Sequence, residues 1–284
     1  GGFLMRRLFA ILAAALLAGS TAAAENLLLP VFAHNAVGQD GSRWSSELYL
    51  TNPSGQPVQV TPAQLLPGQL APTRPCRIFM PPTRVVPPHS AVVWTASGMA
   101  ADLGCAEEAL GGLLLSADGP VIISSRMVRH PAEEGKTGRG FLAGQGQQIP
   151  VLAMDELPRA GSYLLPALHC QREGGAGPAF DTYVGFTNPW PEPVLISIDP
   201  ASDVVDRGLR IDDQEVALPY TFEMPPESWR QIQLRPARAD DDRGSRGPES
   251  IDLLVTIDGP LAFYASVVDR TSQDPRTVLP VALQ

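Results

Sequence analysis

The chain has 284 residues, of which 44% are hydrophobic, and its formal net charge is −9 at pH 7. This acidic balance argues against a nucleic-acid partner, because proteins that bind nucleic acid rely on a basic surface. The hydrophobic content is typical of a folded globular protein and excludes an intrinsically disordered chain.

An export signal is predicted over residues 1–24. Two arginines precede an apolar run of 11 residues, 8–18, and the small-residue stretch 22–24 follows. A basic segment, an apolar segment and a small-residue cleavage site in this order are typical of a secretory signal peptide. We interpret Met5 as the initiator and residues 1–4 as an artefact of the gene start.

The signal also predicts the compartment. Ser20 stands where a lipoprotein signal would need the lipidated cysteine, so we expect a soluble protein in the periplasm or outside the cell. No later apolar run approaches the roughly 20 residues of a membrane-spanning helix, so no transmembrane segment is predicted in the mature chain.

Two copies of one pattern follow the signal. The matched motifs keep the same order in both copies, and they are Leu28-Leu29-Pro30 with Leu164-Leu165-Pro166, Thr51-Asn52-Pro53 with Thr187-Asn188-Pro189, Asp118-Gly119-Pro120 with Asp258-Gly259-Pro260, and Ile149-Pro150-Val151 with Leu279-Pro280-Val281. An ordered series of this kind indicates an internal repeat. We therefore predict two domains, roughly residues 25–157 and 158–284, joined by a short connector that lets them touch.

The matched segments read as strands. Apolar or small residues alternate with polar ones from residue 44 to 51, so that Leu48 and Leu50 share one face, and Val184 and Phe186 share the matching face of the second copy. The opposite face differs between the copies and is expected to be surface. Short strands separated by Pro- and Gly-rich turns predict an all-β fold of two tandem antiparallel Ig-like β-sandwiches, with little helix. The best helix candidate spans residues 100–110.

Three cysteines are present, and a disulfide between Cys76 and Cys105 is predicted. Both lie in the first copy, and an exported protein meets an oxidising compartment where disulfides persist. Cys170, in the second copy, is expected to be a buried, inert thiol. The alternative is that all three cysteines are reduced.

No catalytic residues are predicted. The four histidines, His34, His89, His130 and His169, match no zinc-binding or nucleophile motif. His34 and His169 are interpreted as strand-end residues that face solvent or a loop. We therefore expect a protein that is not an enzyme and that needs no cofactor.

Acidic loops provide weak candidates for a calcium site. Asp199, Asp203 and Asp206 crowd one connection of the second copy, and oxygen-rich loops suit calcium. The run 240–242 is flanked by arginines, which favours a solvated mixed-charge loop. The alternative interpretation is that neither loop binds a metal.

Aromatic residues near turns are the binding candidates. Trp190 follows an Asn-Pro turn and is expected to be exposed, because its counterpart in the first copy is Ser54. Tyr220 flanks a Pro-rich loop, where it could contact a sugar or a protein partner. Trp229, at the other end of that loop, is expected to begin a strand and to pack.

The order of these motifs resembles known families. The series from Leu28-Leu29-Pro30 through Thr51-Asn52-Pro53 and Asp118-Gly119-Pro120 to Ile149-Pro150-Val151 is similar to a class of exported bacterial proteins, uncharacterised in function, that consist of tandem Ig-like sandwiches. Each repeat also resembles, more loosely, the β-sandwich of the sensory rhodopsin transducer family. Both resemblances imply a fold, and the first also implies export. Neither assigns a functional residue.

The sequence leaves several functions open. The first is an exported non-catalytic module for binding, adhesion or cell-surface structure, with a protein or glycan partner. The alternatives are an enzyme or calcium-dependent protein whose site is assembled from loops, and a periplasmic assembly chaperone that donates an edge strand.

Overall fold

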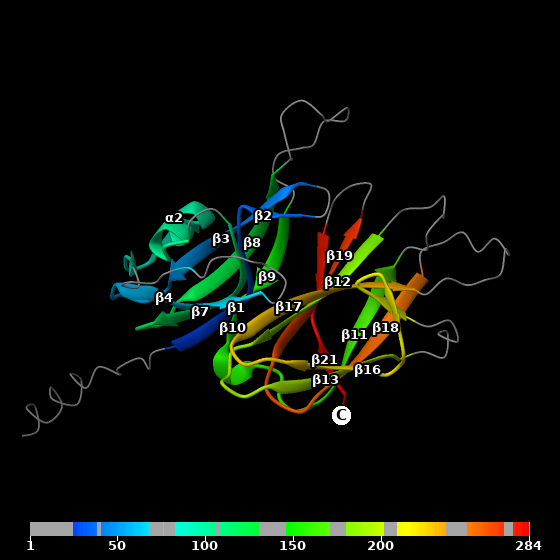
Figure 1. Cartoon of the computed structure of the whole chain (residues 1–284). Helices are drawn as coiled ribbons and strands as arrows, with labels where there is room; N and C mark the ends of the chain where they lie inside the picture. Colours follow the sequence, from blue (N-terminus) through cyan, green and yellow to red (C-terminus); the bar gives the residue numbers. More distant parts are fainter. Residues whose placement is uncertain are drawn as a thin grey trace, which may run out of the picture.

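The computed structural model describes residues 25–38, 41–68, 76, 83–105, 108–130, 146–170, 180–201, 209–236, 249–269 and 275–283. The predicted export signal, residues 1–24, lies outside this part of the chain. The described residues form antiparallel sheets and one α-helix, so the predicted all-β fold is confirmed (Figure 1). No helix in the described ranges is long and apolar enough to cross a membrane.

The first half, residues 25–157, contains two of the sheets. Sheet A has the strand order β10-β1-β7-β4-β5, and sheet B has the order β2-β3-β8-β9 with β6 paired to β3. The strands are β1 (Glu25–His34), β2 (Ala36–Val37), β3 (Arg43–Asn52), β4 (Val58–Pro67), β5 (Arg84–Val86), β6 (Ser90–Thr95), β7 (Ala109–Ala117), β8 (Ile122–His130), β9 (Gly146–Pro150) and β10 (Leu152–Ala153).

The second half, residues 158–284, contains the other two sheets. Sheet C has the order β15-β14-β17-β12-β19-β20, and sheet D has the order β16-β13-β18-β11-β21. The strands are β11 (Gly161–Cys170), β12 (Phe180–Asn188), β13 (Val194–Pro200), β14 (Leu209–Ile211), β15 (Gln214–Val216), β16 (Tyr220–Met224), β17 (Ser228–Pro236), β18 (Glu249–Ile257), β19 (Ala262–Asp269), β20 (Pro275–Val278) and β21 (Val281–Ala282).

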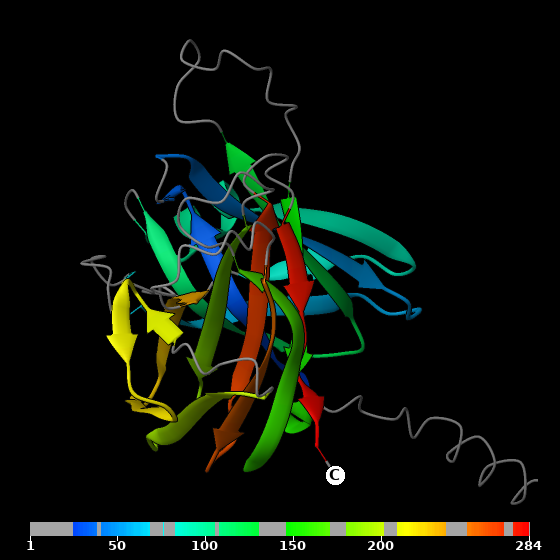
Figure 2. The ribbon, with the colours of Figure 1, turned by 90° about the vertical axis from the view of Figure 1, so that its right-hand side faces the viewer.

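The same strand pairing recurs in both halves. Strand β1 pairs with β7 and shifts register between Leu29 and Phe32, and β11 pairs with β18 and shifts register between Leu165 and Leu168. By strand order, sheet A corresponds to sheet D, and sheet B corresponds to strands β17, β12, β19 and β20 of sheet C. Figures 1 and 2 give two views of these strands. This arrangement is compatible with the predicted tandem repeat, although the exact domain boundaries stay a prediction.

Each half has a core of its own between its two sheets. Leu48 and Leu50 are fully buried in the first core, and Val184 and Phe186 are fully buried in the second. The alternation that predicted the inward face of β3 and β12 is therefore confirmed.

The helix differs from its prediction. Helix α2 spans Ala96–Asp102, where the sequence favoured residues 100–110. Its start is set by Thr95, whose side chain accepts a hydrogen bond from the Gly98 N–H at 3.3 Å and caps the first turn. Residues 109–110 instead begin β7, because pairing with β1 satisfies their backbone groups. A short 3-10 turn, η1 (Met154–Glu156), precedes the second half.

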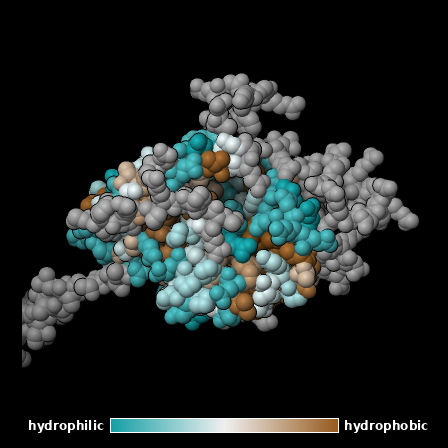
Figure 3. Space-filling model, viewed as in Figure 1, coloured by the Kyte–Doolittle hydropathy of each residue, from teal (hydrophilic) through white to brown (hydrophobic). Residues whose placement is uncertain are grey.

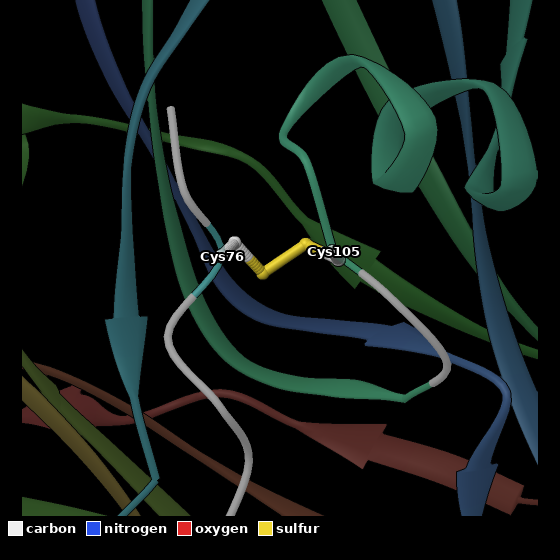
Figure 4. Close-up of a disulfide and its surroundings, with 2 residues drawn as sticks. All are labelled: Cys76 and Cys105. Atoms are coloured by element: carbon white, nitrogen blue, oxygen red, sulfur yellow. A yellow bond between two sulfur atoms is a disulfide. The ribbon is translucent and has the colours of Figure 1, made fainter. Parts of the chain in front are cut away.

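A disulfide joins Cys76 to Cys105, as predicted from the sequence (Figure 4). The bond joins Cys76, which lies in sequence between β4 and β5, to Cys105, which follows α2, and both cysteines pack in the core of the first half. Cys170 is buried in the second core, with 1% of its surface exposed.

Candidate ligand cleft between the two halves

The halves pack through faces that are not equivalent in the repeat. In sheet C, every second residue of β12, β17 and β19 points away from its own core, and some of these outward residues pack against sheet A. Trp229 and Tyr264 of sheet C are buried against the core of the first half. Ala262 packs in a separate buried cluster with Leu28 and Leu66 of sheet A.

A glycine of sheet A allows this close approach, because a Cβ atom at Gly112 of β7 would lie 2.4 Å from Cγ2 of Thr187 in the second half. Within sheet C, a Cβ at Gly185 of β12 would lie 2.5 Å from the ring of Tyr264, its pairing partner on β19, so Gly185 leaves room for that ring. Separations this short are not tolerated between real atoms, so any larger residue at Gly112 would push the halves apart.

Hydrogen bonds fix the contact on both sides. The Thr187 hydroxyl donates to the Pro30 carbonyl at 2.7 Å, and this bond is buried. The Ser266 hydroxyl donates to Oε1 of Gln147 at 2.8 Å, and Nε2 of Gln147 donates to the Thr277 hydroxyl at 2.8 Å. Because buried polar groups are costly to leave unpaired, these bonds favour one relative placement of the halves.

A cleft of ≈ 710 Å³ lies beside this contact. Its volume is within the range of about 300–1,000 Å³ that is usual for small-molecule sites. Residues of both halves line it, so neither half would form it alone. The face of the molecule in Figure 3 shows hydrophobic residues in scattered groups among hydrophilic ones.

The wall from the first half is mainly apolar. Its apolar residues are Val31, Ala33, Ala36, Val37, Trp44, Leu110 and Met127, and Gly38 and the polar Gln147 also line it. Trp44 and Met127 stand on the same faces of β3 and β8 as the buried Ser46 and Leu48. Arg129, further along β8, adds one guanidinium to this wall.

The wall from the second half is polar. Gln233 is 4% exposed, and its side-chain amide donates to Asp181 at 3.2 Å and to the Tyr183 hydroxyl at 3.4 Å. The Gln233 backbone N–H in turn donates to Asp212 at 2.8 Å. This network orients a carboxylate and a phenol on the wall. The Gln231 side chain lies beside it on β17.

Tyr264, which is 2% exposed, also lines the cleft. Burial raises the pKa of its phenol above the ordinary value, and the Trp229 side chain beside it partly opposes that rise. The phenol is therefore neutral at physiological pH and does not act as a base.

The aromatic candidates lie elsewhere. Trp190 was expected to be exposed, but it is partly buried against the cluster at the contact between the halves. Its backbone N–H donates to the side chain of Asn188, which holds the turn against the interface. Tyr220 packs on the second core beside Phe222, at a ring-centroid distance of 5.6 Å. Trp229 lies in β17 and is buried, as expected.

The calcium candidates are not brought together in the described chain. Asp199 lies in β13, paired with Leu254, and Asp203 and Asp206 fall outside the described residues, as does the run 240–242. The described residues contain no group of three or more His, Cys, Asp or Glu side chains placed to hold a metal ion.

The two strand-end histidines differ from the sequence interpretation. His34 and His169 are partly buried, and each has a buried Nδ1 atom without a hydrogen-bond partner among the described residues. His169 packs against Phe180 at 5.4 Å between ring centroids. Burial lowers the pKa of His34 below 6.5. Neither histidine lines the cleft.

Sequence reasoning missed the cleft, because it treated the outward face of β12 as ordinary surface. One signal was present where the copies differ. Gly185 corresponds to Tyr49, and Gly112 corresponds to Asp252. A glycine that replaces a larger residue inside a strand often marks close approach of another backbone or side chain.

Comparison with protein-family models finds no match for this chain, and comparison with curated proteins finds none either. The resemblances suggested by the motif order therefore stay predictions, and functional arguments depend on the geometry of the chain itself.

Proposed function

We propose that the protein is an exported, non-catalytic binding module that holds its ligand in the cleft between the two halves. Adhesion or a structural role at the cell surface would use the same site. The observation that carries this proposal is the cleft of ≈ 710 Å³ lined by both halves.

The chemistry of the cleft supports binding over catalysis. Ser266 is the one serine or threonine among the described residues that line the cleft, and its hydroxyl donates a hydrogen bond to Gln147. No described histidine lines the cleft to activate this hydroxyl as a nucleophile. The amide and carboxylate groups hold one another in place, which suits recognition of a ligand.

Export is supported by two features. Residues 1–24 have the order of a signal peptide, and the disulfide between Cys76 and Cys105 suits an oxidising compartment. We propose that the mature protein acts in the periplasm or outside the cell.

The repeat supplies a matched pair of variants for testing the site. Gln231 lines the cleft, and Val93 occupies the corresponding position on β6, where it is 51% exposed. Gln231→Trp fills the cleft from an outward position without entering a core. Val93→Trp adds the same side chain to an open surface.

The mature chain is screened with a set of small neutral, acidic and basic fragments, and binding is followed by saturation-transfer NMR. We expect at least one chemical class of fragment to bind the parent and Val93→Trp and to lose binding to Gln231→Trp. If every fragment that binds does so equally to all three proteins, the cleft is not the site and the proposal fails.

A further inference from the structure

The two walls of the cleft require a ligand with two kinds of surface. A wholly apolar ligand would strip water from Asp181 and Gln231 without replacing their hydrogen bonds to it, which is costly for polar groups. A wholly polar ligand would leave the wall of Val31, Trp44 and Met127 without an apolar partner.

The polar wall offers donors and acceptors side by side. The Asp181 carboxylate accepts, whereas an amide such as that of Gln231 both donates and accepts. The side-chain amide of Gln231 makes no hydrogen bond with any described residue, so it is available to a ligand in the cleft. A hydroxyl group both donates and accepts hydrogen bonds, so it matches this mixed wall better than a group that can only donate or only accept.

Charge argues for a neutral ligand. The carboxylates of Asp181 and Asp212 on one wall oppose an anion, and Arg129 on the other wall opposes a cation. Asp212 also faces Arg230, with 3.9 Å between the charged atoms, so part of its charge is already neutralised.

The apolar wall can hold the flat side of a ring. Trp44 is partly buried in this wall, and Val37, in the same wall, is 54% exposed. Aromatic side chains pack well on compact apolar faces, and the axial C–H groups of a sugar ring form such a face while its hydroxyls project from the edge.

From these features, and on the basis of the proposed function, we propose that the cleft binds a neutral pyranose sugar, with its C–H face on Trp44 and its hydroxyl edge on Gln231 and Asp181. The sugar ring can belong to a free mono- or disaccharide or to the end of a longer glycan, because both present the same C–H face and hydroxyl edge.

The test uses the mature chain and the disaccharides cellobiose, lactose and chitobiose, with binding measured by calorimetry. Glucuronate and choline serve as an anionic and a cationic probe. We expect at least one neutral disaccharide to bind, and both charged probes to bind at least about tenfold more weakly. If cellobiose binds, cellohexaose distinguishes a free disaccharide from the end of a glycan. A site for a glycan end also binds the longer chain, whereas a site for a free disaccharide does not.

Two variants locate the sugar. Gln231→Leu keeps the side-chain volume and removes the amide, and one or two lost hydrogen bonds predict a loss of affinity of about tenfold. Trp44→Leu removes the aromatic face and should weaken binding by a similar factor. Val93→Leu, at the position that corresponds to Gln231, should bind the sugar as the parent does.

The outcomes separate this inference from the proposed function. Preference for choline, glucuronate or apolar fragments over every neutral disaccharide overturns the sugar assignment, yet it leaves the cleft as a binding site. Sugar binding that is equal in the parent, Gln231→Leu and Trp44→Leu also overturns it. If no ligand is found whose binding to the parent is lost in Gln231→Trp, both the sugar assignment and the proposed binding function are wrong.

Discussion

Asn52 and Asn188 make the same contacts in the two halves. The side-chain amide of Asn52 donates to the backbone carbonyls of Gln56, Val86 and Pro87 at 2.7, 3.0 and 3.2 Å. It lies at the end of β3, between the turn that follows and the segment that leads into β6.

The Asn188 amide repeats this arrangement at the end of β12. It donates to the carbonyls of Glu192, Met224 and Pro225 at 2.7, 3.4 and 3.0 Å. The asparagine of each Asn-Pro motif therefore connects two chain segments by hydrogen bonds, and the motif also marks the end of a strand.

Replacing either asparagine should destabilise the protein to a similar extent. Asn52→Ala and Asn188→Ala each leave buried carbonyls without a donor, for which we expect a loss of about 1–3 kcal/mol in the free energy of unfolding. Asn26→Ala, at an exposed position of β1, should change it by less than about 0.5 kcal/mol. Urea denaturation measures all three. Equal effects at positions 26 and 52 would refute the role assigned to the buried amide.

The inward and outward faces of β3 give a second prediction. Leu48 is fully buried, so Leu48→Ala should cost about 2–5 kcal/mol through lost burial and a cavity. Glu47 points outward and accepts a hydrogen bond from the Tyr49 hydroxyl at 2.9 Å. Glu47→Ala should stay within about 0.5 kcal/mol of the parent. Similar losses at both positions in chemical denaturation would contradict the strand register.

The disulfide should stabilise the first half. Cys76 and Cys105 are separated by 29 positions, and a closed loop of this length predicts a contribution of about 3–4 kcal/mol in the chain-entropy model. The double variant Cys76→Ser/Cys105→Ser should therefore unfold at a lower urea concentration than the parent. A reductant serves as the control, because it should lower the midpoint of the parent toward that of the double variant and leave the double variant unchanged. A midpoint unchanged by the double variant would show that the bridge does not constrain the chain.

His34 should make stability depend on pH. Because burial lowers its pKa in the folded state, the unfolded chain binds the proton more readily, and stability falls as pH drops below about 6.5 toward the folded value. His34→Gln removes this term and should flatten the change in melting temperature between about pH 7 and 5. His130→Gln, at the exposed end of β8, should keep the slope of the parent. The idea fails if both variants lose the slope equally.

Local patterns made much of the fold predictable. Alternation placed Leu48 and Val184 in the cores, and the Asp-Gly-Pro motifs marked turns. In each turn the aspartate also ties the neighbouring strand, since Asp118 accepts from the Gln59 N–H and Asp258 accepts from the Leu195 N–H. These features depend on residues close in sequence or on strand period, which a single chain reveals.

The cleft could not be predicted in the same way. It depends on how the outward face of sheet C lies against the first half, and that placement arises from Gly112, Thr187 and Tyr264, which are distant in sequence. Alternation identifies the two faces of a strand, but it does not tell solvent from a second domain. The exposure expected for Trp190 was wrong for this reason, because its surroundings include Leu28 and Leu157 of the first half.

The account depends most on two separately folded halves that bury their unlike faces against each other. Residues 158–284 contain two tryptophans, Trp190 and Trp229, and both lie at the contact with the first half. The fluorescence emission of this segment alone, recorded with its far-UV circular dichroism, therefore tests the claim directly. We predict a β-sheet spectrum with cooperative unfolding and a red-shifted emission, which shifts back to the blue when residues 25–157 are added. An unfolded segment, or a folded one whose tryptophans remain as shielded as in the whole chain, would contradict the account.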